Sequence, residues 1–480
     1  MKIYHLLFTL ILMQSCASKT ESQSSTHNQI EIYNSLIMSY FGPQEMLANS
    51  KMKIPFAAID DHLDLVKFST TKLPDFVTMQ TFQNGTGYFD VKAPKSSSKS
   101  KIQLIAEDGD QKSIVNCNIN ILKPNSPIKN VKLTDCPNGN LDCKHIPNGE
   151  IIYLSAGFYK SIFIEGKHDL TFVTDVNSEV QIGQVLIKNS KNIKLQGLWV
   201  CPAPHFLKNN PFLIDVDSLS QNIQIVNCTI QTVEDSKSWT QQDWDENAAS
   251  GISIKGKHCK VMNNFIQNTF HAIQIDNNFN EVSYNIVDRF GGDAIRNTGN
   301  DNKFIRNTLK NAVVADYADK DGNHDDLFQS WTFDKPIERI KIIQNNCISI
   351  LEPDLPLKSK VVQGIACFDG FEKDWVIQNN LVVIDHPHGI SLFGAEKCKI
   401  QANKVIRNPY HFNDFEANPW IMINRHKDGR KSKLNQLKYN VVDTIVVKDK
   451  FSAVTIGNYI IDKKPENYFR NYEGWDFRRK

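Results

Sequence analysis

The chain lacks several features that would place it in common functional classes. Its 55 Lys and Arg residues nearly balance its 53 Asp and Glu residues, so it has no basic surplus of the kind that nucleic-acid-binding proteins carry. It contains no Cys-x-x-Cys pair that would indicate a zinc site. Its apolar run from Leu6 to Met13 is too short to span a bilayer. We therefore expect no nucleic-acid partner and no membrane-spanning helix at this end.

The N-terminal segment instead has the pattern of a secretory signal. Lys2 precedes the apolar run, and polar or small residues follow it. The stretch Leu12-Met13-Gln14-Ser15-Cys16 resembles the cleavage site of bacterial lipoproteins, in which the cysteine is lipidated. The resemblance implies a lipoprotein signal peptide over 1–16, a tether over 17–28, export, and membrane attachment through Cys16. Cleavage by an ordinary signal peptidase, which would give a secreted protein, is the alternative.

Residues 29–124 contain strand-like runs that predict a small β domain. Two alternating runs, 100–107 and 113–121, flank an Asp-Gly turn at Asp108-Gly109, which is typical of a β-hairpin. The pair resembles the last two strands of an immunoglobulin-like or cadherin-like β-sandwich. The resemblance implies such a sandwich over 29–124, acting as a spacer or a carbohydrate-binding module. Just beyond it, Cys136 and Cys143 could form a disulfide in an oxidising compartment.

The rest of the chain is a repeat built around asparagine. An apolar-x-apolar run ends in Asn, and the shortest steps between these asparagines are 21, 22 and 23 residues. This period predicts the coil of a parallel β-helix with three short strands per turn, in which stacked side-chain amides hydrogen-bond from coil to coil. The repeated asparagines are Asn227, Asn263-Asn264, Asn285, Asn307, Asn345-Asn346, Asn379-Asn380, Asn403 and Asn440.

A second strand recurs about eight residues after each asparagine, and its register aligns side chains from distant coils. Its outward positions predict two vertical columns on one face, because side chains alternate along a strand. The first column reads Ser250, His271, Asp293, Asp326, Gln363, His388 and Pro419. The second column reads Ser253, Gln274, Arg296, Gln329, Ala366, Ser391 and Met422.

The opening segment of the repeat, 149–159, is similar to the first coil of alginate lyases, chondroitinase B and related proteins of the pectin lyase-like family. The resemblance covers roughly 128–445 at the level of the repeat. It implies an all-β protein in which a right-handed parallel β-helix over 128–480 follows the N-terminal sandwich. It does not specify the chemistry.

One segment, 319–331, is the densest in functional residue types. It reads Asp319-Lys320-Asp321-Gly322-Asn323-His324-Asp325-Asp326-Leu327-Phe328-Gln329-Ser330-Trp331. It permits three interpretations. It is an ordinary Asp-rich turn, or a Ca²⁺ site with Asp325, Asp326 and Asp293 as oxygen ligands, or a catalytic site with paired carboxylates. Together with Gly291-Gly292-Asp293, it is similar to segments of uncharacterised bacterial β-helix proteins, a likeness that implies no activity.

The order of motifs also partly resembles polygalacturonases. Asp293, Asp325-Asp326, His388 and the basic run Arg425-His426-Lys427 follow one another in the order those enzymes show. The resemblance implies hydrolysis by carboxylates. A coil carrying Gln363 separates the Asp pair from His388, however, which displaces the histidine by about 4.8 Å along the axis.

These features predict an exported enzyme that cleaves a uronate-containing acidic polysaccharide by β-elimination, acting as a monomer. A glycoside hydrolase, a polymer-level C5-epimerase and a non-catalytic glycan-binding adhesin are the alternatives. An elimination needs a base and a cation that neutralises the uronate carboxylate. Arg296, His271 or His324 could serve as the base, and Ca²⁺ on Asp293, Asp325 and Asp326 as the cation. Lyases of this fold usually show a Lys and Arg pair, and no such Lys is found. We expect catalytic roles for His271, Asp293, Arg296, His324, Asp326 and His388, and substrate binding by Gln274, Gln329, Trp331, Arg425 and Lys427.

Overall fold

The computed structural model describes residues 36–39, 42, 44–109, 111–203, 211–313, 325–332, 335–359, 362–410 and 418–461. Residues 35–480 form one compact unit. Within the described residues the only α-helix is α1 (Gln241–Asn247), and nearly everything else is β-structure. None of the helices in those residues has the length and apolarity needed to cross a membrane. The predicted signal and tether, 1–28, and the candidate lipidation site Cys16 lie outside the described residues.

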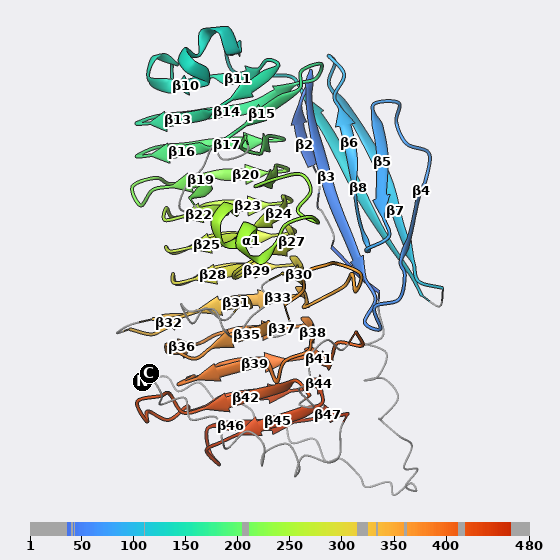
Figure 1. The fold of residues 1–480 in the computed structure, drawn as a ribbon, viewed down its shortest axis with the longest axis vertical. Coiled ribbons are helices and arrows are strands. Elements are labelled where there is room, and N and C mark those ends of the chain that lie inside the picture. Colours follow the sequence, from blue (N-terminus) through green and yellow to red (C-terminus); the bar gives the residue numbers. More distant parts are fainter. Residues whose placement is uncertain are drawn as a thin grey trace, which may run out of the picture. The chain divides into compact units, whose positions relative to one another are not determined.

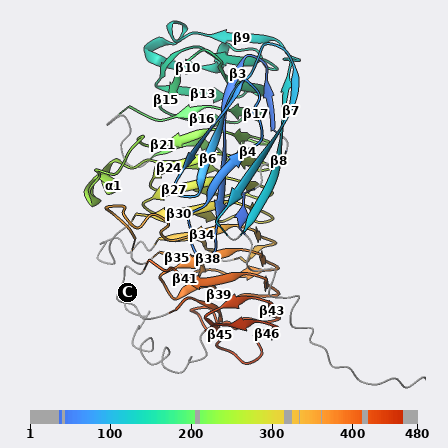
Figure 2. The same ribbon diagram turned by 90° about the vertical axis from the view of Figure 1, so that its right-hand side faces the viewer.

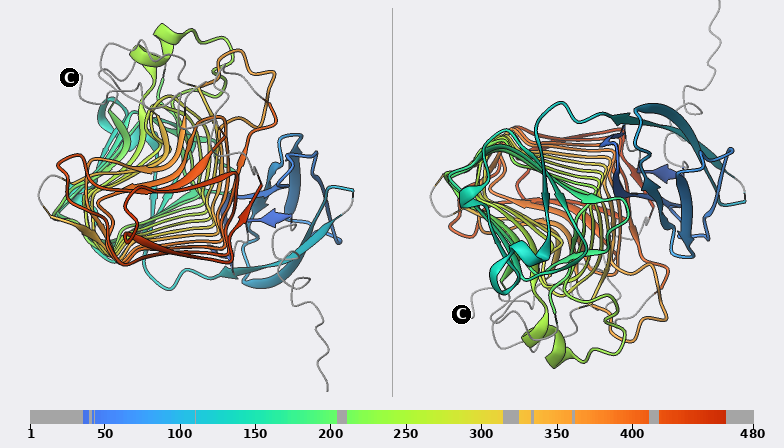
Figure 3. Two further views of the ribbon diagram at one scale, coloured as in Figure 1. Left: turned by 90° about the horizontal axis from the view of Figure 1, so that it is seen from below. Right: turned by 90° about the horizontal axis from the view of Figure 1, so that it is seen from above.

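Three parallel sheets make up most of this unit, and each coil of the chain contributes one strand to each sheet (Figure 1). The successive coils stack into a three-sided column, seen end-on in Figure 3. This arrangement confirms the predicted parallel β-helix; its right-handedness stays a prediction. Sheet 1 consists of β10 (Asn140–Asp142), β13 (Ser161–Glu165), β16 (Val185–Lys188), β19 (Phe212–Val216), β22 (Ser250–Ile254), β25 (Ile273–Ile275), β28 (Ile295–Asn297), β31 (Asp326–Ser330), β35 (Gln363–Cys367), β39 (His388–Phe393), β42 (Trp420–Asn424) and β45 (Thr444–Val447).

The other two sheets follow sheet 1 in each coil. Sheet 2 contains β9 (Ile128–Val131), β11 (Ile151–Leu154), β14 (His168–Asp175), β17 (Lys191–Gln196), β20 (Gln224–Val226), β23 (Lys260–Met262), β26 (Glu281–Ser283), β29 (Lys303–Ile305), β33 (Lys341–Ile343), β37 (Val376–Gln378), β40 (Lys399–Gln401), β43 (Asn435–Lys438) and β46 (Ala453–Ile456). Sheet 3 contains β12 (Gly157–Tyr159), β15 (Val180–Ile182), β18 (Trp199–Val200), β21 (Thr229–Gln231), β24 (Phe265–Thr269), β27 (Ile286–Phe290), β30 (Thr308–Ala312), β34 (Asn346–Ile348), β38 (Leu381–Ile384), β41 (Lys404–Arg407), β44 (Val441–Val442) and β47 (Tyr459–Ile460). Two short strands, β32 (Ile337–Glu338) and β36 (Glu372–Lys373), pair in the turn between sheets 1 and 2.

The asparagine ladder lies at the turn between sheets 2 and 3. In each step a side-chain oxygen accepts both the backbone N–H and the amide N–H of the asparagine one coil earlier; Asn285 bonds to Asn307 in this way at 3.0 and 2.9 Å. The ladder members are Asn264, Asn285, Asn307, Asn345, Asn380, Asn403, Asn440 and Asn458. The expectation for Asn227 was wrong. Cys228 occupies that ladder position, and the Asn227 amide donates to Gln44.

The interior of the column is filled by the inward side chains of all three sheets. Ile252, Ile273, Ile295 and Phe328 follow one another in register along sheet 1 and are fully buried. Because every coil contributes side chains of this kind at the same positions, burial is continuous along the axis and drives the stacking of coils.

The N-terminal residues form two sheets around a separate core (Figure 2). In one, β3 (Ser50–Ile59) pairs antiparallel with β1 (Ile37–Met38) and β6 (Thr86–Lys92), which pairs with β5 (Val77–Phe82). In the other, β8 (Lys112–Leu122) lies between β2 (Gln44–Leu47) and β7 (Ser98–Glu107), and β4 (Lys67–Thr70) pairs with β7. The predicted hairpin is β7–β8, and it is confirmed. The immunoglobulin-like or cadherin-like class of this region stays a prediction.

The cysteines of the described residues are all free thiols. Cys136 and Cys143, the predicted pair, are both buried and not bonded to each other. Burial raises the pKa of the Cys143 thiol to about 12, so it stays protonated and unreactive.

Candidate active site on sheet 1

The structure confirms the predicted register of sheet 1. One outward column is paired strand by strand and consists of Ser253, Gln274, Arg296, Gln329, Ala366, Ser391 and Met422. In the other column Asp326 pairs with Gln363. At the last step His388 pairs with Trp420, not with the expected Pro419, because the register shifts between His388 and Ile390. Such a β-bulge is common beside functional sites.

Asp293 is the centre of the predicted constellation. Its side chain is 0% exposed. One carboxylate oxygen, Oδ1, accepts the backbone N–H of Asp326 on the next coil at 2.9 Å. The other, Oδ2, lies 2.8 Å from Nε of Arg296 in a buried ion pair. A buried carboxylate needs such partners because it has lost its hydration.

His271 lies one coil before Asp293 and is tied to it through the backbone. Its Nδ1 accepts the backbone N–H of Asp293 at 2.9 Å, so the neutral ring carries its proton on Nε2. Burial, together with the nearby charge of Arg296, lowers the pKa of His271 to about 3. The ring is therefore a neutral hydrogen-bond donor at ordinary pH. A Cβ on Gly292 would lie 2.5 Å from this ring, so only glycine leaves room for the His271 side chain here. In the sequence, the Gly291-Gly292 doublet was the signal for this close contact.

Arg296 and Gln329 form the outer layer over the two aspartates. The Arg296 side chain is 21% exposed, and its guanidinium lies 4.9 Å from the ring centre of Trp331. An Nη atom of Arg296 donates to Oε1 of Gln329 at 3.5 Å, and Nε2 of Gln329 donates to Oδ2 of Asp326 at 3.0 Å. Asp293 and Asp326 are both fully buried. Asp293 thus holds the Arg296 guanidinium, and Asp326 the Gln329 amide, toward the surface.

The predicted calcium ligands do not fit a calcium site in this geometry. Asp293 has one oxygen on a backbone N–H and the other against a guanidinium, and a cation beside Arg296 would be repelled. Asp325 is buried next to Asp326, but these residues do not form a group with Asp293 in which three ligand atoms converge. His324 lies outside the described residues.

His388 belongs to a separate cluster farther along the same sheet. Its Nδ1 lies 2.9 Å from Oγ of Ser391 and 3.2 Å from the indole nitrogen of Trp420. The ring is nearly buried and stacks on His386. The β35 coil, with Gln363 in the same column, separates this cluster from Asp326, as the spacing in the sequence predicted.

The remaining predicted binding residues do not converge on Asp293. Arg425 pairs with Asp449, and Lys427 pairs with Asp369, both at the surface. Gln274 lies in the Arg296 column, and its Nε2 donates to Asp276 at 2.8 Å. Thr298 bonds to the same carboxylate at 3.1 Å. Asp276 and Thr298 extend the polar face and were not singled out from the sequence.

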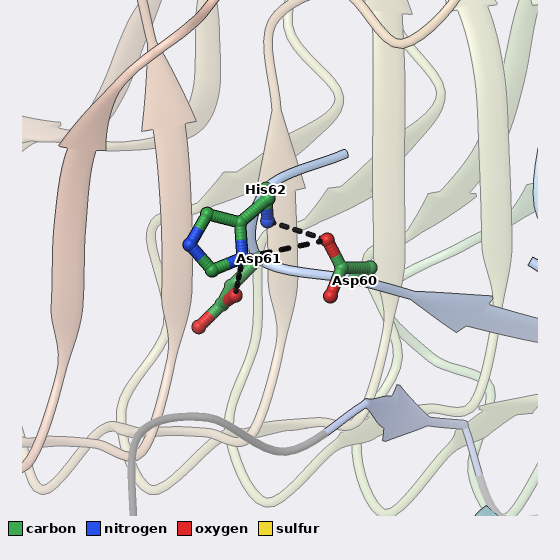
Figure 4. Close-up of side chains that lie close together, drawn as sticks. All are labelled: Asp60, Asp61 and His62. Carbon is green, nitrogen blue, oxygen red and sulfur yellow. Dashed lines mark hydrogen bonds and ion pairs between the residues drawn. The ribbon is translucent and has the colours of Figure 1, made fainter. Parts of the chain in front are cut away.

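A compact acidic group lies away from this face, in the turn after β3 (Figure 4). In the part of the chain that the structure describes, Asp60, Asp61 and His62 are the only three potential metal ligands with their ligand atoms within 4.8 Å of one another. Asp60 Oδ2, however, accepts the backbone N–H groups of His62 and Asp64 at 2.6 and 3.2 Å. Asp61 forms ion pairs with Lys404 of β41 and with His62. The group is explained as a turn that anchors this loop to sheet 3.

A buried network lies near that turn, beside a cavity of about 870 Å³ lined by residues that include Asp60, Asp288 and Glu352. The fully buried ammonium of Lys310 lies 2.6 Å from Asp288 and 3.2 Å from Glu352. Burial opposes ionisation of Glu352, but the Lys310 charge prevails and lowers its pKa. Asn84 also donates to Glu352, at 2.8 Å. This network joins the N-terminal region to sheet 3 and was not predicted.

No protein-family model matches the sequence, and no curated protein matches it. Comparison of folds finds solved structures of low sequence identity. The chain is a parallel β-helix protein. The A-module of mannuronan C-5 epimerase from Azotobacter vinelandii is 9% identical, with a TM-score of 0.38 over 71% of this chain and 90% of that one. A family 28 exopolygalacturonase from Yersinia enterocolitica is 11% identical, with a TM-score of 0.28 over 86% and 97%.

The DFA-IIIase from Arthrobacter chlorophenolicus A6, without its lid, is also similar. It is 11% identical, with a TM-score of 0.39 over 65% of this chain and 83% of that one. Likenesses of this strength assign no chemistry to the present chain, which has to be argued from its own side chains.

Proposed function

We propose that this chain is a polysaccharide-acting enzyme that binds a uronate-containing chain along the outer face of sheet 1 and cleaves it by β-elimination. The observation that carries the proposal is the 2.8 Å ion pair between the fully buried Asp293 carboxylate and the partly exposed Arg296 guanidinium. A β-helix does not need a buried charge pair for its stability, because well-packed apolar side chains serve at least as well. A preorganised cation at the surface of a strand is what recognition of a carboxylate requires.

Arg296 is proposed to bind the uronate carboxylate. Neutralising that carboxylate acidifies the proton on the neighbouring carbon, and a guanidinium can bind both carboxylate oxygens. A base has to take that proton while the bond to the leaving oxygen breaks. His324, which lies outside the described residues, is the proposed base, because Nδ1 of His271 is already occupied by a backbone N–H. Gln329 and the edge of His271, through Nε2–H, supply neutral donors on the same face. Trp331, under the guanidinium, offers an aromatic surface for a sugar ring. Asp293 and Asp326, being buried, act as positioning residues.

The same ion pair favours elimination over hydrolysis. Hydrolysis needs one carboxyl that is protonated and can act as an acid. Both oxygens of Asp293 are engaged inside the protein, one by Arg296 and the other by the backbone N–H of Asp326, and its side chain is fully buried. Asp293 is therefore poorly suited to the acid role that the polygalacturonase likeness implies.

The test is incubation of the purified protein with polygalacturonate, alginate and chondroitin sulfate. β-Elimination yields unsaturated products that absorb in the ultraviolet, and Arg296→Gln is expected to lower that rate about 100-fold or more. Arg339→Gln is the matched control, since this exposed arginine pairs with Asp301 and Glu338 away from sheet 1. New reducing ends without ultraviolet absorbance would show a hydrolase and contradict the proposal. Binding without any product would show an adhesin.

We also propose export, with lipid attachment at Cys16 and with the two N-terminal sheets as an immunoglobulin-like spacer. The support is the sequence pattern around Leu12-Met13-Gln14-Ser15-Cys16. In a bacterial host, Cys16→Ala should abolish incorporation of labelled palmitate and release the protein from the membrane fraction. Unchanged labelling of the variant would contradict the assignment.

A further inference from the structure

Sheet 2 presents a straight column of lysines on its outer face. One outward position is paired from strand to strand along most of the sheet, from Thr171 in β14 to Gln436 in β43. Lysine occupies this position in β17, β23, β29, β33 and β40, as Lys194, Lys260, Lys303, Lys341 and Lys399. In the sequence these lysines stand four residues before the ladder position, so the repeat that aligns the asparagines also aligns the lysines.

Most of these lysines are exposed, and the one acid in their column, Glu281, lies between Lys260 and Lys303. Lys260, Lys303, Lys341 and Lys399 are exposed, while Lys194 is partly covered. Among the described residues none of the five forms an ion pair with a carboxylate. Other surface lysines of the β-helix form ion pairs, for example Lys373 with Glu338 and Lys433 with Glu396. A hollow of about 470 Å³ lies beside Lys194, Gln224 and Lys260.

Like charges repeated along one line repel one another and contribute nothing to the stability of the coils. Lys303 and Lys341 occupy directly adjacent strands, about 4.8 Å apart along the axis. Glu281 is the acid that interrupts the column, between Lys260 and Lys303. A ligand with negative charges repeated along a straight chain would relieve the repulsion between Lys303 and Lys341 and pair with the other exposed lysines of the column.

We propose that this lysine strip (Lys260, Lys303, Lys341 and Lys399) is a non-catalytic docking surface for a linear acidic polysaccharide. A uronate chain carries one carboxylate per sugar and can lie parallel to the axis, so that its charges face the lysines. The strip holds the polymer near the outer face of sheet 1 and raises its local concentration there. The inference takes its polymer class from the proposed function but does not depend on the chemistry at Arg296.

The composition of the strip favours a polysaccharide over a nucleic acid. Single-stranded nucleic acids are bound by basic grooves with aromatic side chains on which bases stack. The outward column from Thr171 to Gln436 contains lysine, threonine, glutamine, glutamate and valine but no aromatic residue and no arginine. Ammonium groups that stand separately along one straight line can each pair with a carboxylate of a linear polymer.

The experiment compares two variants of the full chain with the same loss of charge, both made in the Arg296→Gln background so that the polymer is not cut. The strip variant combines Lys260→Gln, Lys303→Gln, Lys341→Gln and Lys399→Gln. The control combines Lys72→Gln, Lys95→Gln, Lys99→Gln and Lys101→Gln, at exposed lysines of the N-terminal region. Binding to polygalacturonate, alginate, neutral dextran and single-stranded DNA is measured by affinity electrophoresis at several salt concentrations.

The strip variant should bind polygalacturonate or alginate about tenfold more weakly than the control at low salt, and its binding should depend less on salt. Dextran should not bind through the strip in either variant. Equal affinities of strip and control variants would overturn the inference. DNA binding as tight as that of the acidic polysaccharides, with the same lysine dependence, would overturn the polysaccharide assignment. Failure of the wild-type protein to cleave any polymer would contradict the proposed function alone.

Discussion

At the scale of single residues, Glu372 shows how burial inside the coils changes the pKa of a carboxyl group. It is 2% exposed, and its backbone carbonyl accepts a bond from the thiol of Cys398 at 3.5 Å. Burial, together with the charge of Asp369, raises its pKa well above the ordinary value. The carboxyl is therefore neutral in the folded chain over a wide range of pH, and its ionisation opposes folding.

This shift makes stability depend on pH with a definite sign. Because the folded pKa lies above the unfolded one, the stabilising contribution is complete below the unfolded pKa of about 4.3 and declines as the pH rises toward the folded pKa. Glu372→Gln should remove this decline, so the variant should gain up to about 1.4 kcal/mol relative to the wild type for each pH unit in that window. Urea unfolding at several pH values measures the difference. Exposed Glu246→Gln in α1 is the control, and parallel curves for Glu372→Gln and the wild type would contradict the prediction.

At the scale of elements, the turn between sheets 2 and 3 explains the abundance of asparagine. The residue before each ladder position has a left-handed conformation, including Tyr284 at φ 59° and Arg306 at φ 55°. Side chains other than Gly and Asn adopt this region at a cost. The ladder offsets that cost, since each asparagine both accepts and donates along the stack.

Removing one member of the asparagine ladder should therefore be costly. The Asn307 side chain accepts two bonds from Asn285 and donates to Val282 and Asn345, all within 3.0 Å. Asn307→Ala leaves several buried groups without partners and should lower the free energy of unfolding by about 3 kcal/mol or more. Asn140→Ala, which removes one exposed bond to Ser161, should cost less than about 1 kcal/mol. Equal losses for the two variants in urea unfolding would contradict this account.

At the scale of the whole molecule, the coils form a one-dimensional stack in which each contacts mainly its neighbours. Inner coils are covered on both sides, whereas β46 at the C-terminal end of the described column exposes three of its four residues. Stability in such a stack is a sum of coil and interface contributions, so opening should begin where a neighbour is missing.

Hydrogen exchange followed by mass spectrometry measures this gradient. Backbone amides of β43–β47 should exchange faster than those of β23–β29, although both segments carry the same ladder and the same strand pattern. Addition of a reductant should not change the profile, because the cysteines of the described residues are free. Equal protection of the terminal and central coils would show that the ends are covered as well as the middle.

The repeat in the sequence was sufficient to predict a parallel β-helix and the register of sheet 1 as far as the bulge at His388. A short coil with alternating side chains leaves few possible alignments, so Arg296 and Gln329 could be placed in one column from their spacing to the asparagines alone. The alignment of the lysines on sheet 2 also follows from the repeat, but only their exposure in the structure distinguishes a charged docking strip from an ordinary polar edge.

Tertiary structure decided which side chains face solvent and which support them. Burial of Asp293, its bond to the backbone of Asp326 and the space that Gly292 leaves for His271 depend on packing between coils. Asn227 stands at the left-handed position before the ladder, level with Asn263, and its amide donates to Gln44, 183 residues earlier in the chain. The sequence by itself determined the order of side chains along each coil, because that order is local and periodic. Solvent exposure and protonation were decided by contacts between distant residues, which no period encodes.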